Sequence, residues 1–108
     1  MPRETLGELE HQVLLAILRL GGEAYSVPLV VELEERTGRE IAQAAVFIAL
    51  RRLEKKGLLT SRFDDRASEK RGRVRRYFKP TSEALRRLRA TRHNLVRLWE
   101  GLEVVLDQ

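Results

Sequence analysis

The chain has 108 residues and a mass of 12.5 kDa, the size of one small domain. It contains no cysteine, which excludes disulfides, thiolate nucleophiles and zinc fingers. It has no apolar run long enough for a transmembrane helix and no export-signal pattern, so we expect a cytoplasmic protein. No catalytic constellation stands out, and His11 and His93 are expected to face solvent. These absences favour a binding module without cofactor or metal over an enzyme.

The net charge of +5 is unevenly distributed. Residues 1–50 carry four basic and eight acidic side chains, whereas residues 51–108 carry seventeen basic and eight acidic ones. Of the 21 basic residues, 17 are arginine, whose guanidinium group suits bidentate contacts with phosphate and guanine. The asymmetry favours a polyanionic partner. Codon bias in a high-GC genome is the alternative explanation for the arginines.

Apolar spacing predicts three helices in the first half of the chain. The first spans residues 6–20 and is ended by a pair of glycines. Ser26 is predicted to cap a second helix, which ends at Gly38. The third helix spans residues 42–56, with Gly57 as its C-cap.

Two short strands are predicted next, over residues 58–63 and 74–79, because both segments are rich in β-branched and aromatic residues. Three helices followed by a hairpin predict a winged helix-turn-helix, in which the hairpin is the wing. The fold class is therefore mostly α with a small β-hairpin. We expect residues 1–80 to form a DNA-binding domain and residues 81–108 to form a C-terminal dimerisation helix.

The final helix is predicted to begin after a cap at Thr81 and to run to residue 106, a length of about 39 Å. Positions that alternate three and four residues apart are apolar from Leu85 to Leu106, apart from Arg92, which is typical of a heptad seam. Such an arm overshoots a core of about 80 residues, so its outer half needs a second subunit. We predict a homodimer with seven interface residues: Leu14, Leu18, Leu88, Leu95, Trp99, Leu102 and Leu106. Trp99 is either part of this apolar seam or, alternatively, the wall of a cavity for a flat aromatic ligand.

Two surfaces are candidates for contact with double-stranded DNA. In the wing, five of the seven residues from 70 to 76 are basic, which suits phosphate and minor-groove contacts. The outward face of the third helix would enter the major groove, where Gln43 suits adenine and Arg51 suits guanine or phosphate. The alternatives are an alanine-rich helix that mainly packs and a solvated wing tip balanced by nearby acids. The full set of DNA-binding candidates is Gln43, Ala44, Phe47, Arg51, Lys70, Arg71, Arg73 and Arg75.

Five segments share a recognisable pattern: residues 6–10 (LGELE), 23–27 (EAYSV), 34–39 (EERTGR), 50–58 (LRRLEKKGL) and 72–81 (GRVRRYFKPT). Together they resemble the PadR family of bacterial transcriptional regulators, and the single helix after the wing is similar to its short subfamily. The resemblance implies a dimer that binds an inverted-repeat operator, usually as a repressor of a neighbouring operon. It also implies release by a small aromatic or drug-like ligand at the dimer interface, beside a tryptophan of the last helix. Trp99 stands one turn after the family's usual tryptophan position, which is occupied by Leu95.

The chain departs from the family pattern within the helix-turn-helix, mostly by replacing small or polar residues with apolar ones. The family usually has glycine at Ser26, serine at Ala42, glycine at Ala44, tyrosine at Phe47 and threonine-type hydroxyls at Ile48 and Ala49. These departures motivate an alternative function. The protein would then be a winged-helix dimer that acts as a protein–protein interaction module, with weak or no specific DNA binding.

Overall fold

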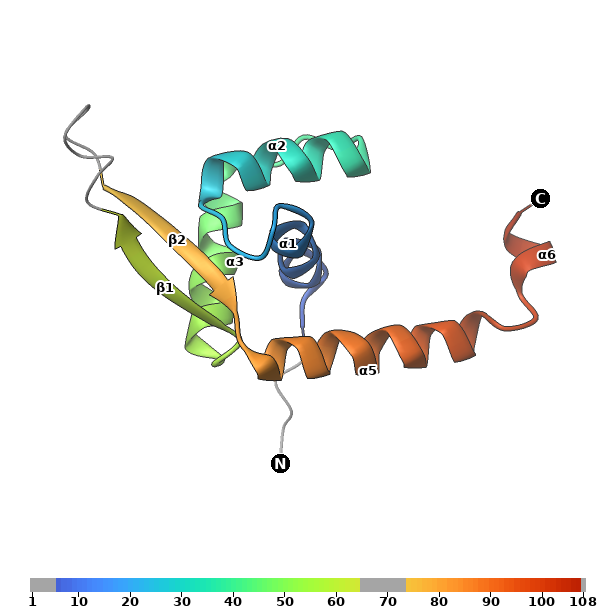
Figure 1. The fold of residues 1–108 in the computed structure, drawn as a ribbon. Coiled ribbons are helices and arrows are strands. Elements are labelled where there is room, and N and C mark those ends of the chain that lie inside the picture. Colours follow the sequence, from blue (N-terminus) through green and yellow to red (C-terminus); the bar gives the residue numbers. More distant parts are fainter. Residues whose placement is uncertain (1–5, 65–73, 108) are drawn as a thin grey trace.

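The computed structural model describes residues 6–64 and 74–107. Three helices precede a two-stranded antiparallel hairpin, and a long helix follows it (Figure 1). This order confirms the predicted winged helix-turn-helix with a long C-terminal helix. The elements are α1 (Glu8–Arg19), α2 (Ser26–Thr37), α3 (Gln43–Lys55), β1 (Leu59–Asp64), β2 (Arg75–Pro80), α5 (Ser82–Trp99) and α6 (Glu103–Leu106).

The core lies between the first three helices and the inner face of the hairpin. In α1 and α3 the fully buried side chains recur at three- and four-residue spacing, which places them on one face of each helix. Leu14 is among them, at 0% exposure. Leu14 was predicted to contact a second subunit, but it is buried in its own subunit and has no surface left for a partner. The adjacent Leu15 is 43% exposed. The largest buried side chains are Val13, Leu14, Ile17, Leu29, Val46, Leu50, Leu53, Leu58 and Phe78.

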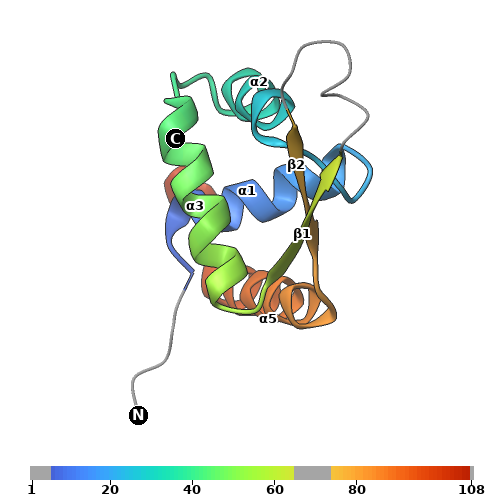
Figure 2. The same ribbon diagram turned by 90° about the vertical axis from the view of Figure 1, so that its left-hand side faces the viewer.

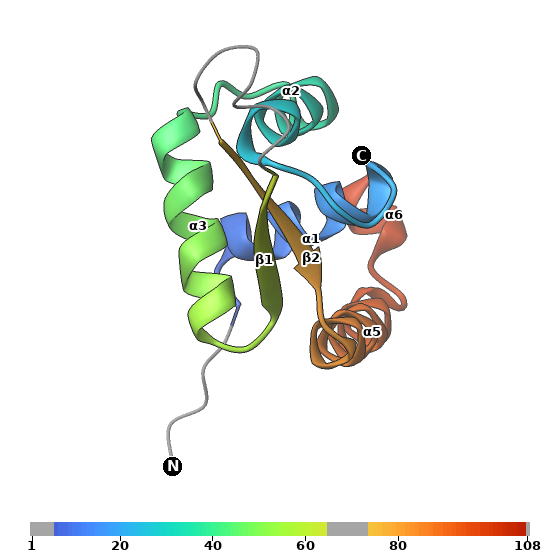
Figure 3. The same ribbon diagram turned by 60° about the vertical axis from the view of Figure 1, so that its left-hand side comes forward.

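The hairpin is paired in register from Leu59 opposite Pro80 to Asp64 opposite Arg75. A third, single-residue strand was not predicted from the sequence. Ala24, in the turn between α1 and α2, exchanges two backbone hydrogen bonds with Phe78, at 3.1 and 2.8 Å. The hairpin lies alongside α3 and in front of α1 (Figure 3). The backbone bonds therefore tie the wing to the body of the domain on the side away from α3.

The helix ends differ in detail from the prediction. Ser26 is the first residue of α2 and Tyr25 is the N-cap, so the predicted cap at Ser26 is wrong by one residue. Ala42 is the N-cap of α3 and offers no side-chain hydrogen bond. Lys56 is the C-cap of α3, and Gly57 follows it with a φ of 79°. Thr81 caps α5 as predicted, since its hydroxyl accepts from the Ala84 N–H at 3.3 Å.

The C-terminal helix is shorter than predicted. α5 ends at Trp99, after 18 residues or about 27 Å, and the chain turns before the four-residue α6. Gly101, with a φ of 84°, adopts a backbone conformation that ends helices and that other residues reach only at a cost. Leu102 and Leu106 therefore do not continue the heptad seam of α5.

The arm formed by α5 and α6 still extends from the domain (Figure 1). The radius of gyration is 15.9 Å, against about 13 Å for a compact domain of this length. Within residues 6–64 and 74–107, no helix is both long and apolar enough to cross a membrane.

Candidate nucleic-acid interface

Helix α3 presents one exposed face beside the wing (Figure 2). Gln43, Ala44, Phe47 and Arg51 are all exposed on this helix, as the prediction requires. The Gln43 amide nitrogen donates to the Ser26 hydroxyl at 3.3 Å, which orients this side chain at the start of α3. The face offers one amide and one guanidinium group among these four residues, so its capacity for direct base contacts is small.

Apolar groups occupy the middle of the exposed face of α3. Phe47 is 38% exposed and packs edge-to-face against Phe78 of β2, with ring centroids 6.4 Å apart at 80°. Ile48 is 52% exposed. Phe47 therefore packs against the inner face of the wing, and part of its ring is exposed on the surface of α3.

The predicted wing contacts are only partly within the described structure, because Lys70, Arg71 and Arg73 lie outside the described residues. Arg75, at the start of β2, is exposed, and its guanidinium group lies 4.6 Å from the centroid of the Tyr25 ring. A hydrogen bond with Tyr77, assisted by the nearby Tyr25, raises the pKa of Arg75. Arg75 is therefore an exposed cation on the outer face of the wing, the face that also carries Tyr77.

A second arginine pairs on the same outer face. Arg62 of β1 donates two hydrogen bonds to Glu23, both at 2.9 Å, and lies 4.8 Å from the Tyr77 ring centroid. Hydrogen bonding to Arg62 lowers the pKa of Glu23. This bidentate pair ties β1 to the turn between α1 and α2.

Arg76 points to the opposite face of the wing, toward α3. It forms an ion pair with Glu54 at 2.7 Å and donates to the Ser61 hydroxyl at 3.1 Å. The charge count over residues 70–76 treats Arg76 like the basic residues beside it, so it does not reveal this role. Strand alternation carries the missing signal, since Arg76 lies two residues from the buried Phe78 and so shares its face.

One buried acid was also missed. Glu10 is 6% exposed, and its Oε1 accepts hydrogen bonds from the Lys56 ammonium and from the Gly7 N–H, both at 2.8 Å. Burial raises the pKa of Glu10, but the hydrogen bonds from Lys56 and Gly7 and the charges of Lys56 and Arg52 outweigh it, so the pKa is lowered overall. The pair joins the start of α1 to the end of α3, which holds α3 in place.

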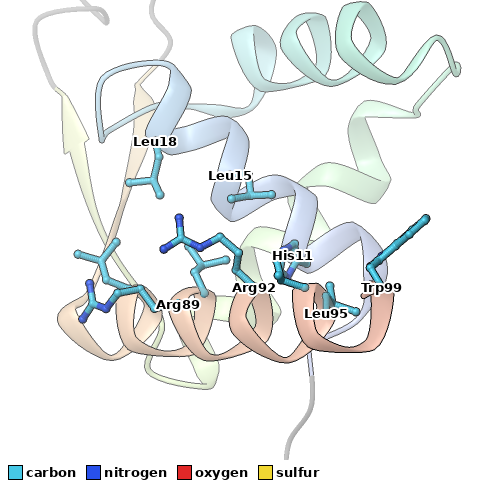
Figure 4. Close-up of a pocket in the computed structure, with 10 residues that line it drawn as sticks. His11, Leu15, Leu18, Arg89, Arg92, Leu95 and Trp99 are labelled. Atoms are coloured by element: carbon cyan, nitrogen blue, oxygen red, sulfur yellow. The ribbon is translucent and has the colours of Figure 1, made fainter. Parts of the chain in front are cut away.

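An apolar groove of about 440 Å³ separates α1 from α5 (Figure 4). His11 is half-buried in its wall, contrary to the predicted solvent position, whereas His93 is exposed as predicted. Leu88 also reaches the groove but is 8% exposed and belongs mainly to the core. The side chains labelled in Figure 4 are His11, Leu15, Leu18, Arg89, Arg92, Leu95 and Trp99.

Three of the predicted interface residues, Leu18, Leu95 and Trp99, line this groove at different points along it, and all three are partly exposed. Leu102 and Leu106, at 45% and 52%, lie beyond the turn at Gly101. Across the described part of the chain, no group of three or more His, Cys, Asp or Glu side chains could hold a metal ion.

An exposed helix beside a wing, on a domain with a strongly basic second half, defines a winged-helix DNA-binding protein. A sequence profile of the PadR-like transcriptional regulator family matches residues 14–90. The crystal structure of a PadR family regulator from Eggerthella lenta is 31% identical, over 89% of this chain and 81% of that chain, with a TM-score of 0.69. The chain therefore belongs to the PadR-like family, whose members are transcriptional regulators and not enzymes.

Two further structures share the fold at lower identity. A PadR family regulator from Clostridium difficile has a TM-score of 0.76 at 18% identity, over 93% of this chain and 99% of that chain. BpsR of Bordetella bronchiseptica, whose DNA binding is regulated by 6-hydroxynicotinic acid, has a TM-score of 0.64 at 21% identity, over 94% of this chain and 71% of that chain. A search of curated proteins found no match.

Proposed function

We propose that the protein is a dimeric, sequence-specific repressor of a neighbouring operon and acts in the cytoplasm. The exposed face of α3 enters the major groove of an inverted-repeat operator, and the wing contacts phosphates and the minor groove. The juxtaposition of these two surfaces carries the proposal: Gln43 and Arg51 are exposed on α3, and Arg75 is exposed on the adjacent wing. The wing supplies much of the affinity, because α3 has few hydrogen-bond donors on its outer face.

Dimerisation through residues 81–108, with residues 1–80 as the DNA-binding domain, is supported by the arm. The arm exposes many large apolar side chains, and monomeric proteins rarely expose large apolar patches unless these are interfaces. A second copy that covers this surface also pairs two recognition helices, as an inverted repeat requires. The exposed side chains are Leu95, Val96, Leu98, Trp99, Leu102, Val104, Val105 and Leu106.

A small aromatic or drug-like effector is the proposed means of release. The groove between α1 and α5 has a volume of about 440 Å³, within the range of small-molecule sites. Trp99 at its end offers a flat ring for stacking. The ligand of BpsR is an aromatic acid of this size class, which supports the choice of chemical class.

Fluorescence anisotropy with duplexes from the region around the protein's own gene tests this function. We expect one inverted repeat to bind far more tightly than a scrambled duplex. With six to ten phosphate contacts per dimer, affinity should fall about 10³- to 10⁵-fold between 50 and 200 mM salt. Equal binding to every duplex, or no binding at about 100 mM salt, would contradict it.

The alternative, a protein–protein interaction module, rests on one observation: Ile48 and Phe47 place apolar surface at the middle of α3, where DNA-binding helices usually carry polar groups. The same titration separates the two functions. An interaction module binds DNA weakly and without preference for a repeat.

A further inference from the structure

Arg76, Glu54 and Ser61 form a closed cluster between the wing and the end of α3. The Arg76 Nη2 donates to Glu54 Oε1 at 2.7 Å, and its Nε donates to the Ser61 hydroxyl at 3.1 Å. The Ser61 hydroxyl in turn donates to Glu54 Oε2 at 2.5 Å. Both carboxylate oxygens of Glu54 and two N–H groups of the Arg76 guanidinium, at Nε and Nη2, therefore form hydrogen bonds within the protein.

The Arg76 guanidinium is also enclosed by aromatic rings. It lies 5.3 Å from the centroid of Phe63 and 5.2 Å from that of Phe78, within the range of cation–π contacts. The side chain is 23% exposed, and that of Glu54 is 28% exposed. These contacts distinguish Arg76 from Arg75, which is exposed on the outer face of the same strand.

A two-stranded hairpin is marginally stable by itself, so its orientation depends on what it packs against. Two side-chain contacts tie the inner face of this wing to α3: the rings of Phe78 and Phe47, and the ion pair of Arg76 with Glu54. Glu54 lies near the end of α3, whereas Phe47 lies in its first half. Contacts at two well-separated points fix the direction of the wing as well as its position.

We propose that Arg76 and Glu54, with Ser61, are positioning residues that set the angle between the wing and α3, and that Arg76 is not a phosphate ligand. This inference rests on the proposed DNA-binding function. Binding to DNA requires α3 and the wing of each subunit in the dimer to contact the duplex at the same time. Loss of the pair lets the wing pivot, and the bound arrangement then costs more entropy to reach.

A positioning role and a purely electrostatic role of Glu54 make opposite predictions for the effect of Glu54→Gln on DNA affinity. A carboxylate near a DNA-binding surface repels phosphates, so its removal should strengthen binding if charge alone matters. If Glu54 positions the wing, the same change should weaken binding. The probe is the duplex that the wild-type protein selects from a random-sequence pool, with affinity measured by anisotropy over a range of salt concentrations.

We expect Glu54→Gln and Arg76→Gln each to weaken binding by about five- to thirty-fold, the effect of one charged hydrogen-bonded pair. The double variant should be no weaker than the worse single variant, because both changes break one interaction. Ser61→Ala changes no charge and should weaken binding by about two- to five-fold. It remains informative if either glutamine variant folds poorly, which thermal unfolding reveals.

Glu23→Gln is the matched control, because Glu23 ties a wing arginine to the turn between α1 and α2 and not to α3, so its loss leaves both contacts between the wing and α3 in place. It should bind at least as tightly as the wild type. Equal or tighter binding by Glu54→Gln overturns the inference, as does an equal loss in Glu23→Gln. A salt slope lowered by about 2 in Arg76→Gln makes Arg76 a phosphate ligand in each subunit and also overturns it. If the wild type selects no duplex, the proposed function itself fails.

Discussion

Replacing Lys56 by methionine should destabilise the protein by about 2–3 kcal/mol, more than replacing Glu10 by glutamine. The two side chains are 18% and 8% exposed, and their charged groups lie 2.8 Å apart. Methionine keeps the length of the lysine stem but removes the ammonium group, so the buried Glu10 Oε1 keeps its hydrogen bond from the Gly7 N–H and loses the one from Lys56. Removing one partner of a buried pair costs about 3–5 kcal/mol, which the partial exposure of Lys56 and the charge of Arg52 reduce.

Glu10→Gln is the milder change and the matched comparison. The glutamine can still accept from Gly7, and the Lys56 ammonium, which is the more exposed group, can turn toward water. We expect a loss of about 1 kcal/mol. Since 1 kcal/mol shifts Tm by about 4–8 °C in a domain of this size, circular dichroism at fixed protein concentration resolves the two variants.

The pH dependence gives a second measurement of the same pair. The pKa of Glu10 is lowered in the folded state, so its contribution to stability is present at neutral pH and is lost as the pH falls through that lowered value. The wild type should therefore lose more Tm between pH 7 and about pH 3.5 than Glu10→Gln, which has no carboxylate at position 10 to protonate. Equal acid sensitivity in both proteins, or equal Tm losses for Lys56→Met and Glu10→Gln at pH 7, would refute the argument from a buried ion pair.

Three further predictions concern the DNA surface and the arm. Changing Arg71, Arg73 and Arg75 together to alanine should lower the salt slope of DNA binding by up to about 5 per dimer without changing the circular dichroism spectrum; an unchanged slope excludes these contacts. Trp99→Ala should weaken the dimer by about 2–3 kcal/mol per subunit, measured by sedimentation equilibrium, because half of the ring is left for a partner; a variant equally dimeric at low micromolar concentration makes Trp99 peripheral. Gly101→Ala should increase helical ellipticity, because alanine disfavours a φ of 84° and favours a continuous helix; a spectrum identical to the wild type contradicts this.

Local patterns predicted most of the fold because they depend on neighbours in the chain. Helical periodicity placed α1, α2 and α3 within about two residues of their observed ends, and the cap at Thr81 was correct. The exposed positions on α3 followed from the same periodicity. The family resemblance stated from short segments was confirmed by the profile match over residues 14–90.

The misses have two physical causes: packing against distant segments, and a local backbone conformation that the apolar spacing does not reveal. Two leucines at adjacent positions, Leu14 and Leu15, are equally apolar, and only the position of α1 against its neighbours decides that the first is buried and the second exposed. The end of α5 at Trp99 was missed because a heptad pattern continues past Gly101, while the backbone conformation of that glycine breaks the helix.

By itself, the sequence determined the order of the elements, the basic second half and the family, since these follow from composition, spacing and local motifs. The tertiary structure alone decided the roles of individual charges. Glu10 and Lys56 are 46 residues apart in sequence, and Glu54 and Arg76 are 22 apart, yet each pair forms an ion pair. A charged side chain takes its role from the partner that the fold brings within 3 Å, and nothing in its sequence neighbours specifies that partner. Arg75 and Arg76, adjacent in sequence, are therefore a surface cation and an internal link.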